Sequence, residues 1–123
     1  MKIVCTKENL TNNINLVYKA ISNRTTLPIL ECILLSVTEE GFKMIANDLQ
    51  LGIETNFIKS DIIETGTIAL EARIFSDIIK TLSNNEDIII YTIENNFTII
   101  KSGKSEFKIS NKLGDEFPIL PKV

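Results

Sequence analysis

The sequence predicts an α+β fold in which two helices pack side by side on one face of antiparallel sheets. Two segments, near residues 10–21 and 72–82, repeat apolar residues at helical spacing. Short apolar runs separated by turn residues follow each of them, as is typical of antiparallel strands. The order strand, helix and three strands occurs twice with a period of about 66 residues, so we expect two βαβββ halves.

The first half begins with a short strand at 2–5, followed by Thr6 as the predicted N-cap of a helix. This helix has an apolar stripe and an opposite polar stripe, the first formed by Leu10, Ile14, Val17 and Ile21 and the second by Glu8, Asn12, Asn15 and Lys19. After a turn at 23–28, we expect strands at about 31–39, 42–47 and 50–59. Glu40 and Gly41 mark the first hairpin turn.

The second half repeats this order. A strand is expected at 66–71 and a helix at 72–82, whose apolar side would carry Ile74, Phe75, Ile78, Ile79 and Leu82. Three strands should follow at about 87–94, 97–102 and 105–110, with turns at 95–96 and 103–104. We therefore expect one domain over 1–123, with an internal pseudo-repeat of about 1–62 and 66–112 and an extended tail from 112 onward.

Composition narrows the classes of function. The chain has 44% hydrophobic residues, a net charge of −3 and no histidine. The missing histidine removes the commonest general base and excludes a Cys/His zinc site. Cys5 and Cys32 stand alone in apolar runs, so we expect two reduced core residues. We predict no catalytic residue, no metal and no cofactor. With no hydrophobic signal or long apolar run, we expect a cytoplasmic protein.

Two features that suggest chemistry have simpler interpretations. Asp48, Glu54 and Asp77 fall in separate predicted elements, so solvated or capping roles are favoured over paired acid–base catalysis. Residues 103–105 (GKS) look like the end of a phosphate-binding loop. However, Thr98 stands where that loop needs its first glycine, and a strand follows instead of a helix. We expect a hairpin turn.

Four cations fall on or beside the polar helix stripes. Arg73 and Lys80 are seven residues apart and share one stripe, Lys19 lies on the first helix, and Arg24 follows it. The spacing also allows Asp77 to pair with Arg73. If the helices pack side by side, these cations share one surface. The spacing alone leaves two alternatives open, an ordinary solvated helix face and a surface that contacts DNA.

Several motifs resemble the first domain of the bacterial sliding clamp, the ring-shaped β subunit of DNA polymerase III. They cover nearly the whole chain and comprise residues 24–30 (RTTLPIL), 47–50 (NDLQ), 72–75 (ARIF) and 102–107 (SGKSEF). The resemblance implies the DNA-clamp fold. It also implies that the polar helix faces line a central hole, where Arg24 and Arg73 match family residues that contact DNA. Lys19 and Lys80 follow by position.

The resemblance also implies a role for the last predicted strand, at 105–110, in the contact between subunits. In the family this region meets the third domain of a neighbouring subunit, which would bury Phe107 and Ile109 and place Lys104 at the subunit interface. The alternative is an edge strand that lysines protect against aggregation.

The resemblance implies a noncatalytic processivity factor. A clamp subunit contains three such domains, so this chain would be about a third of one, and 113–123 would begin the connector to the next. The expected partners are double-stranded DNA without sequence preference, the replicative polymerase, the clamp loader, and a second subunit in a head-to-tail homodimer. Two rivals remain, a stand-alone module that binds proteins through its strand edge and a small enzyme.

Overall fold

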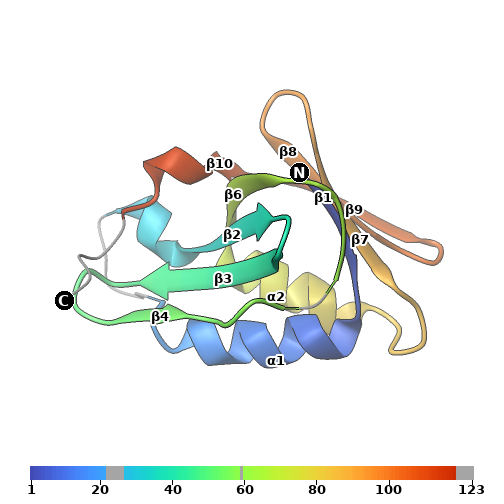
Figure 1. The fold of residues 1–123 in the computed structure, drawn as a ribbon, viewed down its shortest axis with the longest axis horizontal. Helices are drawn as coiled ribbons and strands as arrows, with labels where there is room; N and C mark the ends of the chain where they lie inside the picture. The colour runs from blue at the N-terminus through green and yellow to red at the C-terminus, as the bar shows by residue number, and fades with distance from the viewer. Residues whose placement is uncertain (22–26, 59, 119–123) are drawn as a thin grey trace.

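A computed structural model describes the chain except for residues 22–26, 59 and 119–123. Within the described residues, two five-stranded antiparallel sheets and two α-helices enclose the main core (Figure 1). Sheet A has the order β5-β1-β7-β8-β9 and sheet B the order β10-β6-β2-β3-β4. The helices pack against each other, α1 against β3 and α2 against β6. None of the described helices is long and apolar enough to cross a lipid bilayer.

The elements have the following bounds. Sheet A contains β1 (Lys2–Cys5), β5 (Asp61–Glu64), β7 (Ile88–Ile93), β8 (Phe97–Ser102) and β9 (Ser105–Ser110). Sheet B contains β2 (Cys32–Thr38), β3 (Gly41–Asn47), β4 (Gly52–Glu54), β6 (Gly66–Glu71) and β10 (Lys112–Leu113). The helices are α1 (Lys7–Tyr18) and α2 (Ala72–Thr81), and the short 3-10 helices are η1 (Pro28–Glu31) and η2 (Gly114–Glu116).

The two halves exchange strands. The first half runs from β1 through α1 to β5, yet β1 and β5 join the sheet formed by β7, β8 and β9 of the second half. In return, β6 and β10 of the second half join β2, β3 and β4. The predicted fold class, two packed helices on antiparallel sheets, is confirmed, but each half ends in one short strand more than the predicted βαβββ order, β5 in the first half and β10 in the second.

Two strand predictions need correction. The strand expected at 50–59 is shorter, because β4 covers only Gly52–Glu54 and Ile58 adds a single bridge to Phe42. Two strands were not predicted, β5 and β10, with four and two residues. Neither strand is long enough for an alternation of apolar and polar residues to be recognised. Each forms because a neighbouring strand offers free backbone N–H and C=O groups for pairing.

Helix α1 begins where its cap predicts. The Thr6 hydroxyl accepts a hydrogen bond from the Asn9 backbone N–H at 3.2 Å. Leu10, Ile14 and Val17 are buried, while Ile21 lies beyond the helix and packs partly buried against the core.

The apolar side of α2 differs from the prediction at one position. Phe75, Ile78 and Ile79 are buried, but Ile74 is 42% exposed. At about 100° per residue, Ile74 lies roughly a quarter-turn from the centre of the buried stripe. The assignment of Ile74 to the core was therefore wrong.

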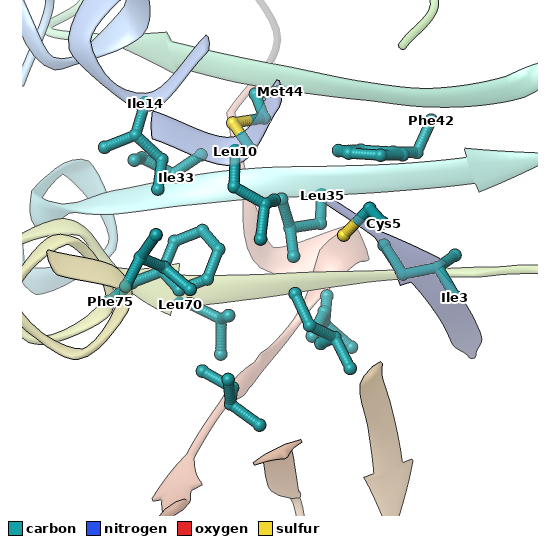
Figure 2. Close-up of a cluster of buried hydrophobic side chains, with 14 of the residues drawn as sticks. Ile3, Cys5, Leu10, Ile14, Ile33, Leu35, Phe42, Met44, Leu70 and Phe75 are labelled. Atoms are coloured by element: carbon teal, nitrogen blue, oxygen red, sulfur yellow. The ribbon is translucent and has the colours of Figure 1, made fainter. Parts of the chain in front are cut away.

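The main core draws on both halves and both sheets (Figure 2). Its largest fully buried members include Leu10 of α1, Leu35 of β2, Phe42 of β3, Leu70 of β6 and Phe75 of α2. Because strands from both halves supply these side chains, the core forms only when the halves come together.

Both cysteines are buried and free. Burial, with a smaller contribution from Asp87, raises the pKa of the Cys5 thiol to about 12. Burial also raises the pKa of the Cys32 thiol to about 11. Both thiols therefore stay protonated at neutral pH, as expected of structural cysteines.

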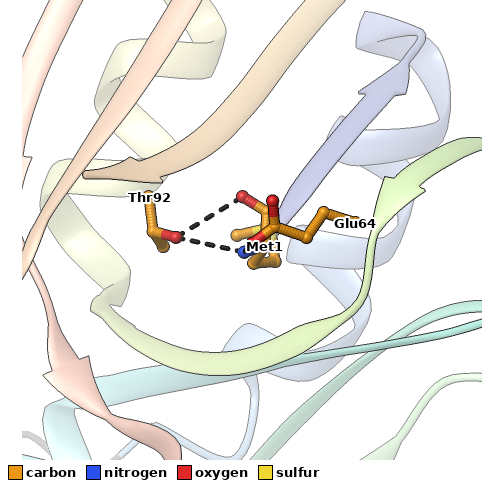
Figure 3. A network of polar contacts seen from close by, with 3 residues as sticks. All are labelled: Met1, Glu64 and Thr92. Atoms are coloured by element: carbon orange, nitrogen blue, oxygen red, sulfur yellow. Dashed lines mark hydrogen bonds and ion pairs between the residues drawn. The ribbon is translucent and has the colours of Figure 1, made fainter. Parts of the chain in front are cut away.

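A polar network joins three strands of sheet A at the chain's first residue (Figure 3). The Met1 ammonium donates to Glu64 Oε1 at 3.0 Å and to Thr92 Oγ1 at 3.1 Å. Met1 is only 6% exposed. A buried ammonium requires such partners, so this network fixes β1 between β5 and β7.

Candidate nucleic-acid interface

The helices α1 and α2 run antiparallel. Lys7, the first residue of α1, donates from Nζ to the backbone oxygens of Lys80 at 3.1 Å and Leu82 at 2.7 Å, at the end of α2. Thr11 and Asn15 of α1 line a small gap together with Ser76 and Lys80 of α2. The start of α2 therefore lies beside the end of α1.

This arrangement places the predicted cations. Arg73 is exposed in the first turn of α2 and Lys80 is exposed in its last turn, both on the side opposite the buried Phe75. Lys19 is exposed at the C-cap of α1. The antiparallel packing brings Lys19 and Arg73 to the same end of the helical layer and puts Lys80 at the other end. Arg24 lies outside the described residues.

The helical layer is more positive than the chain as a whole. From Lys7 to the C-cap Lys19 and from the N-cap Glu71 along α2, four cations (Lys7, Lys19, Arg73 and Lys80) accompany three acids (Glu8, Glu71 and Asp77), whereas the whole chain carries −3. The ion pair that spacing allows between Arg73 and Asp77 does not form within the described structure, where the ion pairs join other residues. Arg73 is therefore available to an external anion.

The three carboxylates considered for catalysis either make structural contacts or lie exposed to solvent. Asp48 accepts hydrogen bonds from the backbone N–H groups of Leu51 and Gln50, which lower the pKa of its carboxyl below the ordinary value. Glu54 pairs with Lys43 at 3.3 Å. Asp77 is exposed on α2. Among the described residues, no three potential metal-ligating side chains come together.

The glycine–lysine–serine sequence forms the predicted hairpin turn. Gly103 adopts φ 55° between β8 and β9, a conformation that favours glycine. A strand follows it, so no helix N-terminus is present to bind phosphate there.

The predicted interface strand β9 lies at an edge of sheet A and pairs with β8. Phe107 and Ile109 are partly buried and pack against the chain's own core. Lys104 is exposed in the preceding turn.

One residue important to this surface was not predicted. Lys7 connects the two helices through its bonds to Lys80 and Leu82, 73 and 75 residues away. Its position in the first helical turn gave no signal, because helical spacing reports only neighbours three or four residues apart.

Comparisons with known proteins agree with this geometry. The family model for the N-terminal domain of the DNA polymerase III beta subunit matches residues 1–121. The beta sliding clamp of Bacillus subtilis is 34% identical over 131 residues, a match that covers 100% of this chain and 34% of that protein. The beta sliding clamp of Staphylococcus epidermidis is 37% identical over 130 residues, with the same coverage of 100% and 34%.

Solved structures give the same result. A DNA polymerase III beta subunit from Eubacterium rectale matches with a TM-score of 0.94 and 46% identity, covering 100% of this chain and 33% of that one. The DNA polymerase sliding clamp from Bacillus subtilis matches with a TM-score of 0.91 and 35% identity, covering 100% and 34%. The chain belongs to the family of DNA polymerase III beta subunit N-terminal domains. It spans about a third of the length of these relatives.

Proposed function

We propose that this chain is the first domain of a ring-shaped sliding clamp, a noncatalytic cytoplasmic factor that tethers the replicative polymerase to duplex DNA. The family match supports this proposal, and so do relatives described as beta sliding clamps. The observation that carries it is the net positive outer face of two antiparallel helices on an otherwise acidic chain.

The proposed DNA-contacting residues are Arg24 and Arg73, with Lys19 and Lys80 as weaker contributors. Arg73 and Lys19 are exposed at the same end of the helical layer, which supports their joint action. Two to four phosphate contacts give a salt slope of only about −2 to −4, because each contributes about −0.9. Such weak, sequence-independent contacts suit a ring, which is retained by encircling the duplex and must slide along it.

The remaining parts of the proposal concern assembly. The domain would span 1–123, with the pseudo-repeat at about 1–62 and 66–112 and the interdomain connector beginning at 113. The β9 edge, with Phe107, Ile109 and Lys104, would meet a second subunit in a head-to-tail homodimer. The unpaired side of β9 offers backbone groups for strand pairing across that junction. The polymerase and the clamp loader would bind through the full-length protein.

The test uses a full-length protein that carries this domain, with Arg24→Ala and Arg73→Ala combined. We expect processive synthesis on a primed template to shorten, while the protein's fold and dimerisation stay intact. The matched control is Lys43→Ala, because Lys43 alternates with the buried Phe42 and Met44 and so points away from the core. Unchanged loading and processivity in the double variant would contradict the proposal and favour a protein-interaction module.

A further inference from the structure

Residues 112–118, which we call the covering segment, lie over the face of sheet B opposite to the main core. They comprise β10, η2 and the two residues after η2. Alternate residues of β2 point to opposite faces, so Leu35 belongs to the main core, whereas Cys32 and Leu34 belong to a second apolar cluster. Phe117 of the covering segment is only 4% exposed and completes this cluster. The covering segment therefore closes a small second core.

The start of the covering segment is held by the backbone of β6. The strand β10 pairs with Ile68 and Ala69. At Gly114 the segment approaches β6 so closely that an added Cβ would collide with the Thr67 side chain. A glycine is required for such an approach because it has no Cβ.

The end of the covering segment is held by Asn47, the last residue of β3. Its Nδ2 donates to the Pro118 backbone oxygen at 2.8 Å, and its Oδ1 accepts from the Leu49 backbone N–H at 3.2 Å. Asn47 is only 2% exposed, so its polar atoms need partners within the protein. Since the Leu49 N–H requires the oxygen of the amide, the nitrogen faces Pro118. This side chain therefore joins the turn after β3 to the covering segment.

The turn after β3 has a fixed shape. Asp48 Oδ1 accepts hydrogen bonds from the backbone N–H groups of Gln50 at 2.9 Å and Leu51 at 2.7 Å. Leu49 has φ 77°, a left-handed conformation that is unfavourable for a residue other than glycine. The hydrogen bonds to the Asn47 and Asp48 side chains offset this strain. The motif at 47–50 (NDLQ) thus forms a preorganised turn that holds a distant segment.

This attachment lies at a defined end of sheet B. Leu34 of β2 opposes Ile45 of β3 and Ala69 of β6. Two residues further along their strands, Asn47 and Glu71 therefore lie at the same end of the sheet. Helix α2 begins directly after Glu71, at the end of the helical layer where the cations of both helices meet. The covering segment thus ends beside the start of α2.

We propose that Asn47 is a positioning residue, which fixes the point and the direction in which the chain leaves this domain toward the next domain of the clamp. This inference rests on the proposed function, in which the connector begins at 113. The covering segment is held in three places, by pairing of β10 with β6, by Phe117 over β2, and by Asn47 at the end of β3. Without the contact to Asn47, its last residue loses its orientation.

The two cysteines report separately on this contact. Cys32 lies in the cluster that Phe117 completes, whereas Cys5 lies in the main core, and each is 3% exposed. Release of the covering segment should expose Cys32 to a thiol reagent and leave Cys5 protected. Global unfolding exposes both thiols, so the ratio of the two labelling rates separates local release from loss of the fold.

The test labels both thiols of chain 1–123 with and without the substitution Asn47→Asp. The carboxylate has the size of the amide and can still accept from the Leu49 N–H, but it cannot donate to the Pro118 oxygen. We expect labelling of Cys32 to accelerate at least about 5-fold while labelling of Cys5 stays unchanged. Asn47→Ala removes both hydrogen bonds without burying a charge, and it should give the same selective acceleration.

The matched control is Ser102→Ala. Ser102 is also buried, and its side chain also donates to a backbone oxygen, that of Asp87, but in sheet A. This variant should leave the labelling of Cys32 unchanged. Equal protection of Cys32 in both Asn47 variants and the unchanged chain would overturn the proposal. Equal acceleration at Cys5 and Cys32 would also overturn it, because Asn47 would then stabilise the whole fold.

A second measurement, on the full-length protein, tests the direction of the connector. Rings that carry Asn47→Asp should leave a nicked circular duplex at least about 2-fold faster than rings that carry Ser102→Ala, because an unoriented connector must be ordered when the ring closes. Equal rates would contradict the role of Asn47 in orienting the next domain. If even the unchanged protein is not retained on the circle, the proposed function fails, whereas thiol labelling still decides whether Asn47 holds the covering segment.

Discussion

At the scale of single residues, the burial of a side chain, and not its apolar character alone, decides how much it contributes to the stability of the fold. Phe75 and Ile74 are neighbours on α2, yet the first is fully buried and the second is 42% exposed. The sequence assigned both to the core, because a quarter-turn from the stripe centre is the boundary at which periodicity stops discriminating.

This difference predicts unequal costs of truncation. Phe75→Ala removes a buried ring from the main core and should lower the free energy of unfolding by about 3–5 kcal/mol. Ile74→Ala serves as the control and should change it by less than about 1 kcal/mol. Urea denaturation of the two variants measures both values. Equal losses would show that Ile74 belongs to the core after all.

The buried thiols predict a pH dependence. Because the pKa of Cys5 rises to about 12 and that of Cys32 to about 11, the folded chain disfavours both thiolates. The stability that the two protonated thiols contribute to the folded chain is therefore fully present below the ordinary thiol pKa. It is lost as the pH rises from there through the pKa values that the two thiols have in the folded chain. The folded chain should react with a thiol reagent at pH 8 at least ~100-fold more slowly than a free cysteine peptide. Rapid labelling of the folded chain would contradict this.

At the scale of elements, local signals predicted α1, β1 and β6 well. Thr6 and the stripe from Leu10 to Val17 lie within one segment, so the sequence shows them directly. In contrast, β10 has two residues and depends on pairing with Ile68 and Ala69. The cover of sheet B by Phe117 and the contact of Lys7 with α2 are likewise long-range. Such features arise from the packing of distant segments and leave no local pattern.

The helix pair offers a test at this scale. Lys7→Met keeps the aliphatic stem but removes the two hydrogen bonds to the end of α2. This change should lower the free energy of unfolding by about 1–2 kcal/mol, because the donor is charged and the acceptors lie at a helix end. Thermal unfolding measures the loss. Lys19→Met is the matched control, because Lys19 is exposed at the other end of α1, and it should have little effect. Equal melting temperatures for the two variants would show that Lys7 does not join the helices.

At the scale of the whole molecule, strand exchange makes the two halves mutually dependent. The strand β1 pairs with β7 of the other half, and Ile3 is fully buried opposite Ile90. The period in the sequence predicted two halves but not this exchange. An alternating pattern indicates which face of a strand is buried, but it does not indicate which other strand lies beside it.

This dependence predicts that fragments 1–65 and 66–123 do not fold separately. Each fragment leaves apolar sheet faces exposed and lacks strands that complete its sheet. Circular dichroism should show no cooperative thermal transition for either fragment, in contrast to the whole chain. A cooperative transition in one fragment would mean that one half forms its own core.

The central claim is that the cationic helical layer faces duplex DNA while the sheets face outward. Photo-crosslinking from a ring loaded on circular duplex tests it most directly. The full-length protein would carry a photoreactive amino acid in place of Arg73 or Lys19, or in place of Lys101 on the outer face of sheet A as the control. We predict DNA crosslinks from positions 73 and 19 and none above background from position 101. Crosslinks of equal yield from position 101, or none from position 73, would contradict the account.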